Sequence, residues 1–158
     1  MRDALRRTAV GIGEIAVSAD AEERLCIFGL GSCVALYLFA PGSPAVGVAH
    51  VVLPQSAGRD GKVGRFADTA LPALVAEMRS LGVAPSELRA AITGGANVLG
   101  FGTEIGQQNV AAVRMGLAHL EIPIVQDDTG GRRGRSVEFD PLRQEIAVRV
   151  LSSPQVSI

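Results

Sequence analysis

Two apolar segments separated by a short turn place the strongest constraint on the fold of this chain. Residues 34–39 and 45–53 are almost entirely apolar, and the intervening sequence at 41–44 is Pro-Gly-Ser-Pro, which is typical of a turn. Segments of this length predict buried strands, and the turn predicts that they pair antiparallel as a hairpin. His50 interrupts the second apolar segment, where burial of its ring is costly unless the ring has a partner.

The remaining sequence alternates strand-like and helical segments. Helical periodicity predicts helices over 66–81 and 109–120, with Thr69 as N-cap so that Pro72 falls in the first turn. The second helix is expected to bury Val110, Val113, Leu117 and Leu120. Further strands are predicted at 10–17, 24–28, 88–93, 122–125, 136–139 and 145–151, with a loop over 55–64 and a turn over 127–131.

These elements predict an α+β fold. Because the strands come in hairpins, we expect a single-domain layered sandwich over residues 1–158. Its helices are expected to pack on largely antiparallel or mixed β-sheets.

Composition excludes several classes of protein. The chain has 15 Lys and Arg against 16 Asp and Glu, so it lacks the basic excess of a nucleic-acid-binding protein. No apolar run of membrane-spanning length is present, so no membrane insertion is expected. The basic N-terminus is not followed by the apolar region of a secretory signal. With only two cysteines, a cytoplasmic protein with free thiols is expected. The arginines at 132, 133 and 135 are interpreted as part of a solvated loop.

Cys33 is the candidate nucleophile. It follows Gly29-Leu-Gly-Ser32 and precedes the apolar segment 34–39. The glycines permit a tight turn, whose backbone N–H groups, those of Gly31 and Ser32 among them, would bind an oxyanion and lower the thiol pKa. A lone cysteine at this place also fits a small buried residue at a strand edge, which is the role assigned to Cys26.

His50 is the candidate base. In the predicted hairpin, its strand lies beside the strand that starts after Cys33, so the imidazole and the thiol are expected to meet near the open end. A Cys–His pair is the minimal activated nucleophile. His119, near the end of a predicted helix, is interpreted as structural.

No cofactor or metal is expected. The sequence Gly29-x-Gly31 precedes a strand, whereas a dinucleotide-binding fingerprint opens a helix and needs a third glycine. Asp127 and Asp128 are adjacent, so on a strand their side chains would face opposite ways and would not form a metal pair.

Seven sequence blocks, in order along nearly the whole chain, resemble a known family. They are Gly-Leu-Gly-Ser-Cys-Val at 29–34, Ala-His-Val-Val-Leu-Pro at 49–54, Arg-Phe-Ala-Asp-Thr-Ala at 65–70, Gly-Gly-Ala at 94–96, Ile-Gly-Gln-Gln-Asn-Val at 105–110, Asp-Asp-Thr-Gly-Gly at 127–131 and Gly-Arg-Ser-Val-Glu-Phe at 134–139. The combination resembles the CheD family of chemoreceptor glutamine deamidases.

The resemblance implies a cytoplasmic enzyme that converts selected glutamine side chains of methyl-accepting chemotaxis receptors to glutamate and releases ammonia. It implies a layered fold, and it implies the CheC phosphatase as a partner besides the receptor's cytoplasmic helices. The family's nucleophile falls on Cys33 and its base on His50.

One position departs from the family pattern. The threonine that the family usually has six residues before the cysteine is replaced here by Ile27, which has no side-chain oxygen. Either a backbone carbonyl orients His50, with the backbone at Ile27 as a candidate, or another hydroxyl such as that of Ser32 does so, or activity is weakened. Two other functions stay open: a weakly active or inactive module that binds and regulates CheC, and a Cys–His hydrolase that acts on another protein.

Overall fold

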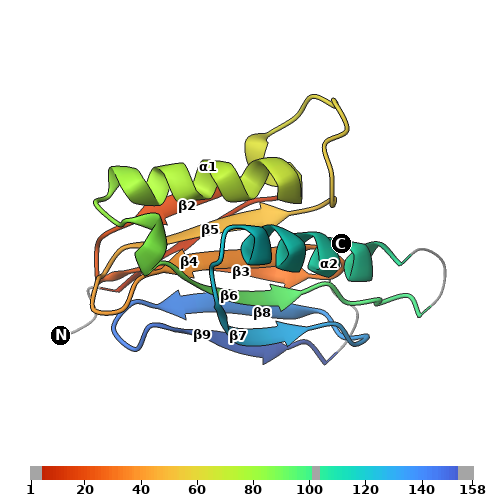
Figure 1. Cartoon of the computed structure of the whole chain (residues 1–158). Coiled ribbons are helices and arrows are strands. Elements are labelled where there is room, and N and C mark those ends of the chain that lie inside the picture. Colours follow the sequence, from red (N-terminus) through yellow and green to blue (C-terminus); the bar gives the residue numbers. More distant parts are fainter. Residues whose placement is uncertain (1–4, 101–103, 153–158) are drawn as a thin grey trace.

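The fold has three layers. A computed structural model describes residues 5–100 and 104–152 of the chain. In these residues, two helices cover one face of a five-stranded sheet, and a four-stranded sheet packs on its other face (Figure 1). The predicted α+β class, with helices packed on mixed sheets, is confirmed.

The five-stranded sheet contains the predicted hairpin at its centre. Its strands, in spatial order, are β2 (Ile15–Ser18), β5 (Val46–Val51), β4 (Val34–Phe39), β6 (Arg89–Gly94) and β7 (Ile124–Thr129). All neighbours pair antiparallel except β6 and β7, which are parallel. In the hairpin, Ala35 of β4 lies opposite His50 of β5.

The four-stranded sheet is built from the two ends of the described chain. Its order is β1 (Arg6–Ala9), β3 (Glu23–Leu30), β8 (Arg135–Asp140) and β9 (Glu145–Val150). Strands β1 and β3 are parallel, whereas β8 and β9, which fall on the predicted strands 136–139 and 145–151, pair antiparallel as a hairpin.

The first helix, α1 (Ala67–Ser80), lies within the predicted range 66–81 but begins before Thr69, the expected N-cap. The N-cap is Phe66, whose carbonyl oxygen accepts the N–H of Ala70 (N···O 2.8 Å). Phe66 is extended because it bridges to Leu53, so the helix starts directly after this contact. Thr69 is therefore inside the helix, and Pro72 is its sixth residue, beyond the first turn, on an exposed position.

The second helix, α2 (Ile105–His119), also begins before its predicted start. It buries Asn109, Val113 and Leu117, whereas Leu120 caps the C-terminus with 43% of its surface exposed and was wrongly expected to face inward. Short 3-10 turns, η1 (Val63–Arg65) and η2 (Pro85–Glu87), precede α1 and β6. Neither helix, nor any other in the described ranges, has the length and apolarity needed to cross a membrane.

Two predicted segments are wrong in their boundaries. Of the strand predicted at 10–17, only residues 15–17 are extended, as part of β2; residues 10–14 form the crossing from β1, which lies before the predicted range and in the other sheet. Gly13 makes this crossing possible because its φ of 76° lies in the left-handed region. The turn predicted at 127–131 is reduced to Gly130 and Gly131, since β7 continues in parallel with β6 as far as Thr129.

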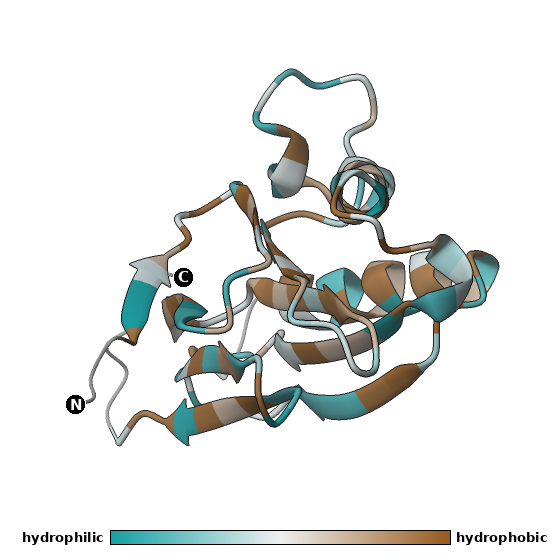
Figure 2. Ribbon diagram, turned by 90° about the vertical axis from the view of Figure 1, so that its left-hand side faces the viewer, coloured by the Kyte–Doolittle hydropathy of each residue, from teal (hydrophilic) through white to brown (hydrophobic). Residues whose placement is uncertain are grey.

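The core is divided between the two sides of the five-stranded sheet. Side chains of β4 alternate: Leu36 and Leu38 pack toward the helices, whereas Tyr37 and Phe39 pack toward the other sheet. Hydrophobic residues follow the strands in Figure 2, and the loop before α1, which contains hydrophilic residues, extends away from the layers. The Tyr37 hydroxyl donates to the carbonyl oxygen of Leu25 (O···O 2.7 Å) and so joins the two sheets.

Candidate active site

Cys33 and His50 lie on the same face of the five-stranded sheet, the face that packs on the other sheet. Cys33 directly precedes β4, and its side chain belongs to the apolar cluster between the sheets together with that of Ala35. His50 is the direct partner of Ala35 on β5. Cys33 and His50 are therefore diagonal cross-strand neighbours, whose Cα atoms are about 7–8 Å apart in typical sheets, with the side chains closer.

The thiol of Cys33 is neutral at physiological pH. Only 1% of the residue's surface is exposed, and burial raises its pKa to about 11. The sequence-based expectation of a lowered pKa is wrong, because burial removes the hydration that stabilises the thiolate. A neutral thiol must lose its proton to a base before it attacks a carbonyl carbon.

His50 is also neutral, and its tautomer is defined. The ring is 4% exposed, and burial lowers its pKa; the contact with the Val10 carbonyl and the charge of Glu14 partly oppose that shift. The ring Nδ1 lies 3.2 Å from the carbonyl oxygen of Val10. Because a carbonyl only accepts, Nδ1 carries the proton and donates it, which leaves the Nε2 lone pair available as a base.

The backbone group that orients His50 belongs to Val10 and not to Ile27. Ile27 is fully buried in β3, where it packs in the cluster between the sheets and pairs with Val137 of β8. Val10 lies instead in the crossing from β1 to β2. The same crossing holds the backbone of His50, since the N–H of Gly13 donates to its carbonyl (N···O 3.0 Å). The carbonyl of Val10 thus supplies the hydrogen-bond acceptor that the side chain of Ile27 cannot provide.

Three consecutive carbonyl groups anchor the turn that carries Cys33. The carbonyl oxygens of Gly31 and Cys33 accept the N–H groups of Ala96 (2.9 Å) and Gly95 (2.8 Å), in the loop after β6. That of Ser32 accepts the side-chain amide of Asn109 on α2 (3.0 Å). The loop after β6 and α2 therefore fix this turn together.

The residues that lead into the turn belong to the four-stranded sheet, because Gly29 is part of β3. The N–H of Gly29 donates to the hydroxyl of Ser136 on β8 (3.1 Å), and Gly29 has a φ of 70° that a residue with a side chain rarely adopts. Both sheets therefore contribute to the position of Cys33.

Sequence reasoning missed three groups that contact or act on His50 or on the backbone beside Cys33 and His50: the Val10 carbonyl, Glu14 and Asn109. A signal existed for two of these positions. Gly11 and Gly13 mark a break in the predicted strand, and Asn109 lies one helical turn before Val113 on the predicted apolar face. Nothing in the local sequence signals that the Glu14 charge acts on His50.

The second cysteine belongs to a different environment. Cys26 is fully buried on β3, next to Ile27, which faces the cluster between the sheets, so its side chain is on the opposite face. Its Sγ lies 4.0 Å from a carboxylate oxygen of Glu138, and burial raises its pKa to about 11. Among the described residues, no group of three or more His, Cys, Asp or Glu side chains is arranged to hold a metal ion.

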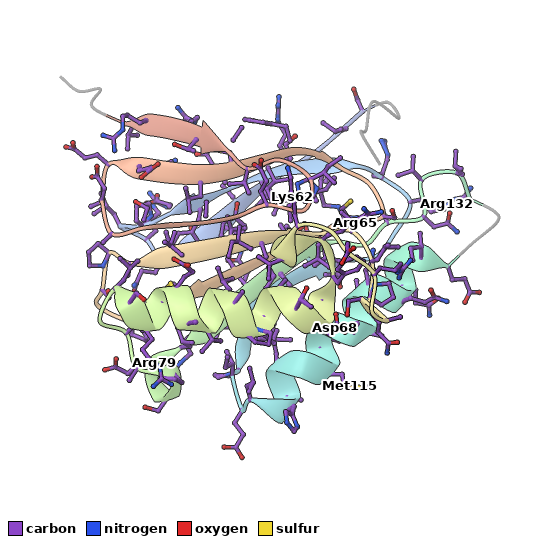
Figure 3. The ribbon with its side chains drawn as sticks, turned by 90° about the horizontal axis from the view of Figure 1, so that it is seen from above. Lys62, Arg65, Asp68, Arg79, Met115 and Arg132 are labelled. Atoms are coloured by element: carbon purple, nitrogen blue, oxygen red, sulfur yellow. The ribbon has the colours of Figure 1, made fainter. Side chains whose placement is uncertain are left out.

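The arginine cluster at 132–135 is not uniformly solvated. Arg132 is exposed on the loop between β7 and β8 (Figure 3), and Arg133 is exposed as well. Arg135 is only 5% exposed, and its guanidinium donates to the backbone carbonyls of Asp128, Gly130 and Arg133. It is therefore part of the scaffold of this loop.

An apolar groove of about 690 Å³ lies between α1 and α2. Asp68 of α1 and Met115 of α2 line it and are seen together in Figure 3, and His119 lines it as well. The helices cover the face of the sheet opposite to Cys33 and His50, so the groove is separate from these two residues.

Comparison with known proteins identifies the family. Residues 52–150 match the family model described as CheD, chemotactic sensory transduction. A protein of Thermotoga maritima named chemoreceptor glutamine deamidase CheD is 40% identical over 144 residues, which cover 90% of this chain and 91% of the relative. Proteins of the same name from Bacillus licheniformis and Halalkalibacterium halodurans are 35% and 37% identical, over 94% and 82% of this chain and 93% and 85% of their own length. This chain belongs to the CheD family.

Proposed function

We propose that this chain is a protein-glutamine deamidase that converts glutamine side chains of chemoreceptors to glutamate, with Cys33 as nucleophile and His50 as base. The observation that carries the proposal is the contact between His50 Nδ1 and the Val10 carbonyl. It leaves Nε2 unprotonated on the face of the sheet where Cys33 lies. The names of the relatives supply the substrate class.

The first half of the reaction forms a thioester. His50 Nε2 takes the proton of the Cys33 thiol as the sulfur attacks the δ-carbonyl carbon of glutamine. The resulting imidazolium is stabilised by the Val10 carbonyl and by the negative charge of Glu14. It then returns the proton to the amide nitrogen as the C–N bond breaks, and ammonia leaves.

The oxyanion is held by the turn before β4. A peptide N–H points opposite to the carbonyl of the same peptide group. The Ser32 carbonyl points to Asn109 on the helix side, so the N–H of Cys33 is directed toward the face that holds the thiol. The N–H of Ser32 points away from Ala96 for the same reason. We assign these two groups, supported by Gly31, to the oxyanion.

The second half of the reaction is hydrolysis. A water molecule gives a proton to His50 and attacks the thioester carbonyl, and the thiol of Cys33 is restored as glutamate is released. The product carries a negative charge where glutamine was neutral, which changes the electrostatics of a receptor helix. Because the substrate is the cytoplasmic part of a receptor, this function places the chain in the cytoplasm, where CheC is the expected second partner.

The purely regulatory alternative is less well supported. It rests on Ile27, which lacks the hydroxyl of the family's threonine. The Val10 carbonyl provides an acceptor for His50 Nδ1, so the substitution at Ile27 does not by itself remove the base.

The proposal is tested by intact-mass analysis of receptor cytoplasmic fragments incubated with the purified protein. We expect a gain of about 1 Da for each modified glutamine, the difference between an amide and an acid. Cys33→Ala is expected to abolish the gain, and His50→Ala to slow it about 10²–10⁴-fold. Cys26→Ala removes the other buried cysteine and is expected to leave the rate nearly unchanged.

Two outcomes would contradict the proposal. If intact protein modifies no fragment from several different receptors, the deamidase function is wrong. If the gain persists in Cys33→Ala, the nucleophile is wrongly assigned.

A further inference from the structure

A single asparagine binds both backbone segments that carry Cys33 and His50, the proposed catalytic dyad. Asn109 is fully buried on the sheet-facing side of α2. Its Nδ2 donates to the carbonyl oxygen of Ser32 (3.0 Å) and to that of Val52 (2.8 Å). Ser32 directly precedes Cys33, and Val52 follows His50 by two residues, so one amide group spans the open end of the hairpin.

The close approach of α2 to the sheet makes these contacts possible. A Cβ atom at Gly106, in the first turn of α2, would lie 2.7 Å from backbone atoms of Gly95 and Ala96. A Cβ atom at Gly95 would lie 2.3 Å from the side chain of Val110. Because these glycines have no side chains, the start of α2 packs directly on the loop after β6, within reach of Ser32.

The orientation of the Asn109 amide follows from its neighbours. Both atoms it contacts are carbonyl oxygens, so the nitrogen must face them and the oxygen must face away. Among the described residues, Asn109 Oδ1 is buried without a hydrogen-bond partner. An unpaired buried oxygen costs free energy that an apolar side chain would avoid. The two bonds to the dyad segments offset this cost.

We propose that Asn109 is a positioning residue that fixes the Cys33 thiol relative to the His50 imidazole by binding the carbonyls of Ser32 and Val52. Asn109 lies on the opposite face of the sheet from the dyad and does not touch the reacting atoms. Its bond to the Ser32 carbonyl also polarises the peptide group whose N–H belongs to Cys33, the proposed oxyanion donor. The expected effect on the rate of deamidation rests on the proposed function.

The test compares Asn109→Ala with Val113→Ala, which truncates a buried side chain one turn further along α2. Displacement of catalytic groups by a distant substitution costs up to about 10²-fold in rate. We therefore expect Asn109→Ala to lower kcat on receptor fragments about 10–100-fold with KM nearly unchanged, measured well below the unfolding temperature. Val113→Ala is expected to lose stability while keeping kcat within about twofold.

A second variant guards against misfolding of Asn109→Ala. Asn109→Asp preserves the shape of the side chain and removes at least one of the two donated bonds, so kcat is again expected to fall. A folded Asn109→Ala or Asn109→Asp with the kcat of the unmodified protein would overturn the proposal. An equal loss of kcat in Val113→Ala would do the same, because it would show a general effect of loosening α2.

A readout without receptor separates this inference from the proposed function. The alkylation rate of Cys33 by iodoacetamide, followed by peptide mass, reports the surroundings of the thiol directly. We expect a several-fold change in Asn109→Ala and none in Val113→Ala. If the intact protein fails to deamidate receptors but this difference is found, Asn109 still positions Cys33 and only the proposed reaction is wrong. If deamidation is found but neither kcat nor alkylation depends on Asn109, the positioning role is wrong.

Discussion

The imidazole of His50 receives its orientation from the main chain. A side-chain hydroxyl donates and accepts and can rotate, whereas the Val10 carbonyl only accepts and is fixed by the crossing between β1 and β2. The tautomer of His50 therefore depends on where the backbone runs. Changes of the Val10 side chain preserve this acceptor as long as the crossing keeps its path.

Among the described residues, Glu14 is the acidic group whose charge acts on the pKa of His50, and it raises that pKa against the effect of burial. The carboxylate pairs with Lys62 (3.3 Å) and accepts the N–H of Gly11 (2.8 Å). The folded pKa of His50 is below its ordinary value of 6.5, so His50 is neutral near pH 7. The rate of deamidation should therefore be maximal near neutral pH and fall as the pH drops through the lowered pKa and the base becomes protonated.

Glu14→Gln is expected to lower the pKa of His50 further, because it removes a charge that favours the imidazolium. The acid limb of kcat/KM should move to lower pH, and kcat should fall because the imidazolium intermediate is less stabilised. Imidazole resonances of His50 in an NMR titration measure the pKa directly. An unchanged or higher pKa of His50 would show that Glu14 does not act on it.

At the level of elements, the β4–β5 hairpin is the part of the site that sequence predicts well. The Pro-Gly-Ser-Pro turn at 41–44 defines the pairing, and the strand alternation then places Cys33 and His50 on one face. These are local signals, spaced by a few residues. Val10 is 40 residues away in sequence from its partner His50, and Asn109 is 77 residues away from its partner Ser32. No periodicity in the sequence encodes contacts of such separation.

The wrongly predicted strand at 10–17 illustrates the same limit. Its apolar alternation is compatible with one continuous strand, yet only residues 15–17 belong to a strand, β2, and residues 10–14 cross over from the other sheet. This crossing segment is not part of a strand, and it contacts His50 through the Val10 carbonyl and the Gly13 N–H. The local strand pattern therefore predicts the wrong structure at the residues that contact His50.

Gly94→Ala is expected to damage the site from the end of β6. A Cβ atom at this position would lie 2.2 Å from the Cys33 carbonyl oxygen, and the φ of Gly94 is 110°. Gly42→Ala is the matched control, since Gly42 also has a positive φ, 77°, but a Cβ there meets no atom within 4 Å. We expect Gly42→Ala to cost about 1–2 kcal/mol and keep kcat.

For Gly94→Ala, we expect a larger loss of unfolding free energy in urea and at least a tenfold lower kcat, since Cys33 itself must move. If both alanine variants behave alike in urea and in kcat, the contact between Gly94 and the Cys33 carbonyl is unimportant.

At the level of the whole molecule, the dyad depends on the packing of two sheets. His50 belongs to the five-stranded sheet and Cys33 directly precedes its strand β4, whereas the chain reaches Cys33 from β3 of the other sheet, where the hydroxyl of Ser136 accepts the N–H of Gly29. The Tyr37 ring stacks on Phe139 across the same interface, with 5.6 Å between centroids. Loss of contact between the sheets would therefore alter the site as well as the stability.

Tyr37→Phe is expected to lower the free energy of unfolding by about 1–3 kcal/mol, because it leaves the Leu25 carbonyl without the hydroxyl that joins the sheets. The ring and its stacking on Phe139 are preserved, so the change isolates one hydrogen bond. Urea denaturation followed by circular dichroism measures the effect. An unchanged midpoint would mean that this bond contributes nothing to the association of the sheets.

The burial of Cys33 has a consequence for its chemical survival. Peroxides and other cellular oxidants react with thiolates, and a thiol with a pKa of about 11 is almost entirely protonated at neutral pH. The proposed nucleophile is thus shielded from conversion to sulfenic acid while no glutamine is present. An ion pair with imidazolium would attack faster, but it would also be the first group in the protein to be oxidised. The neutral Cys33 thiol is therefore less nucleophilic in the absence of substrate, and for the same reason it is less readily oxidised.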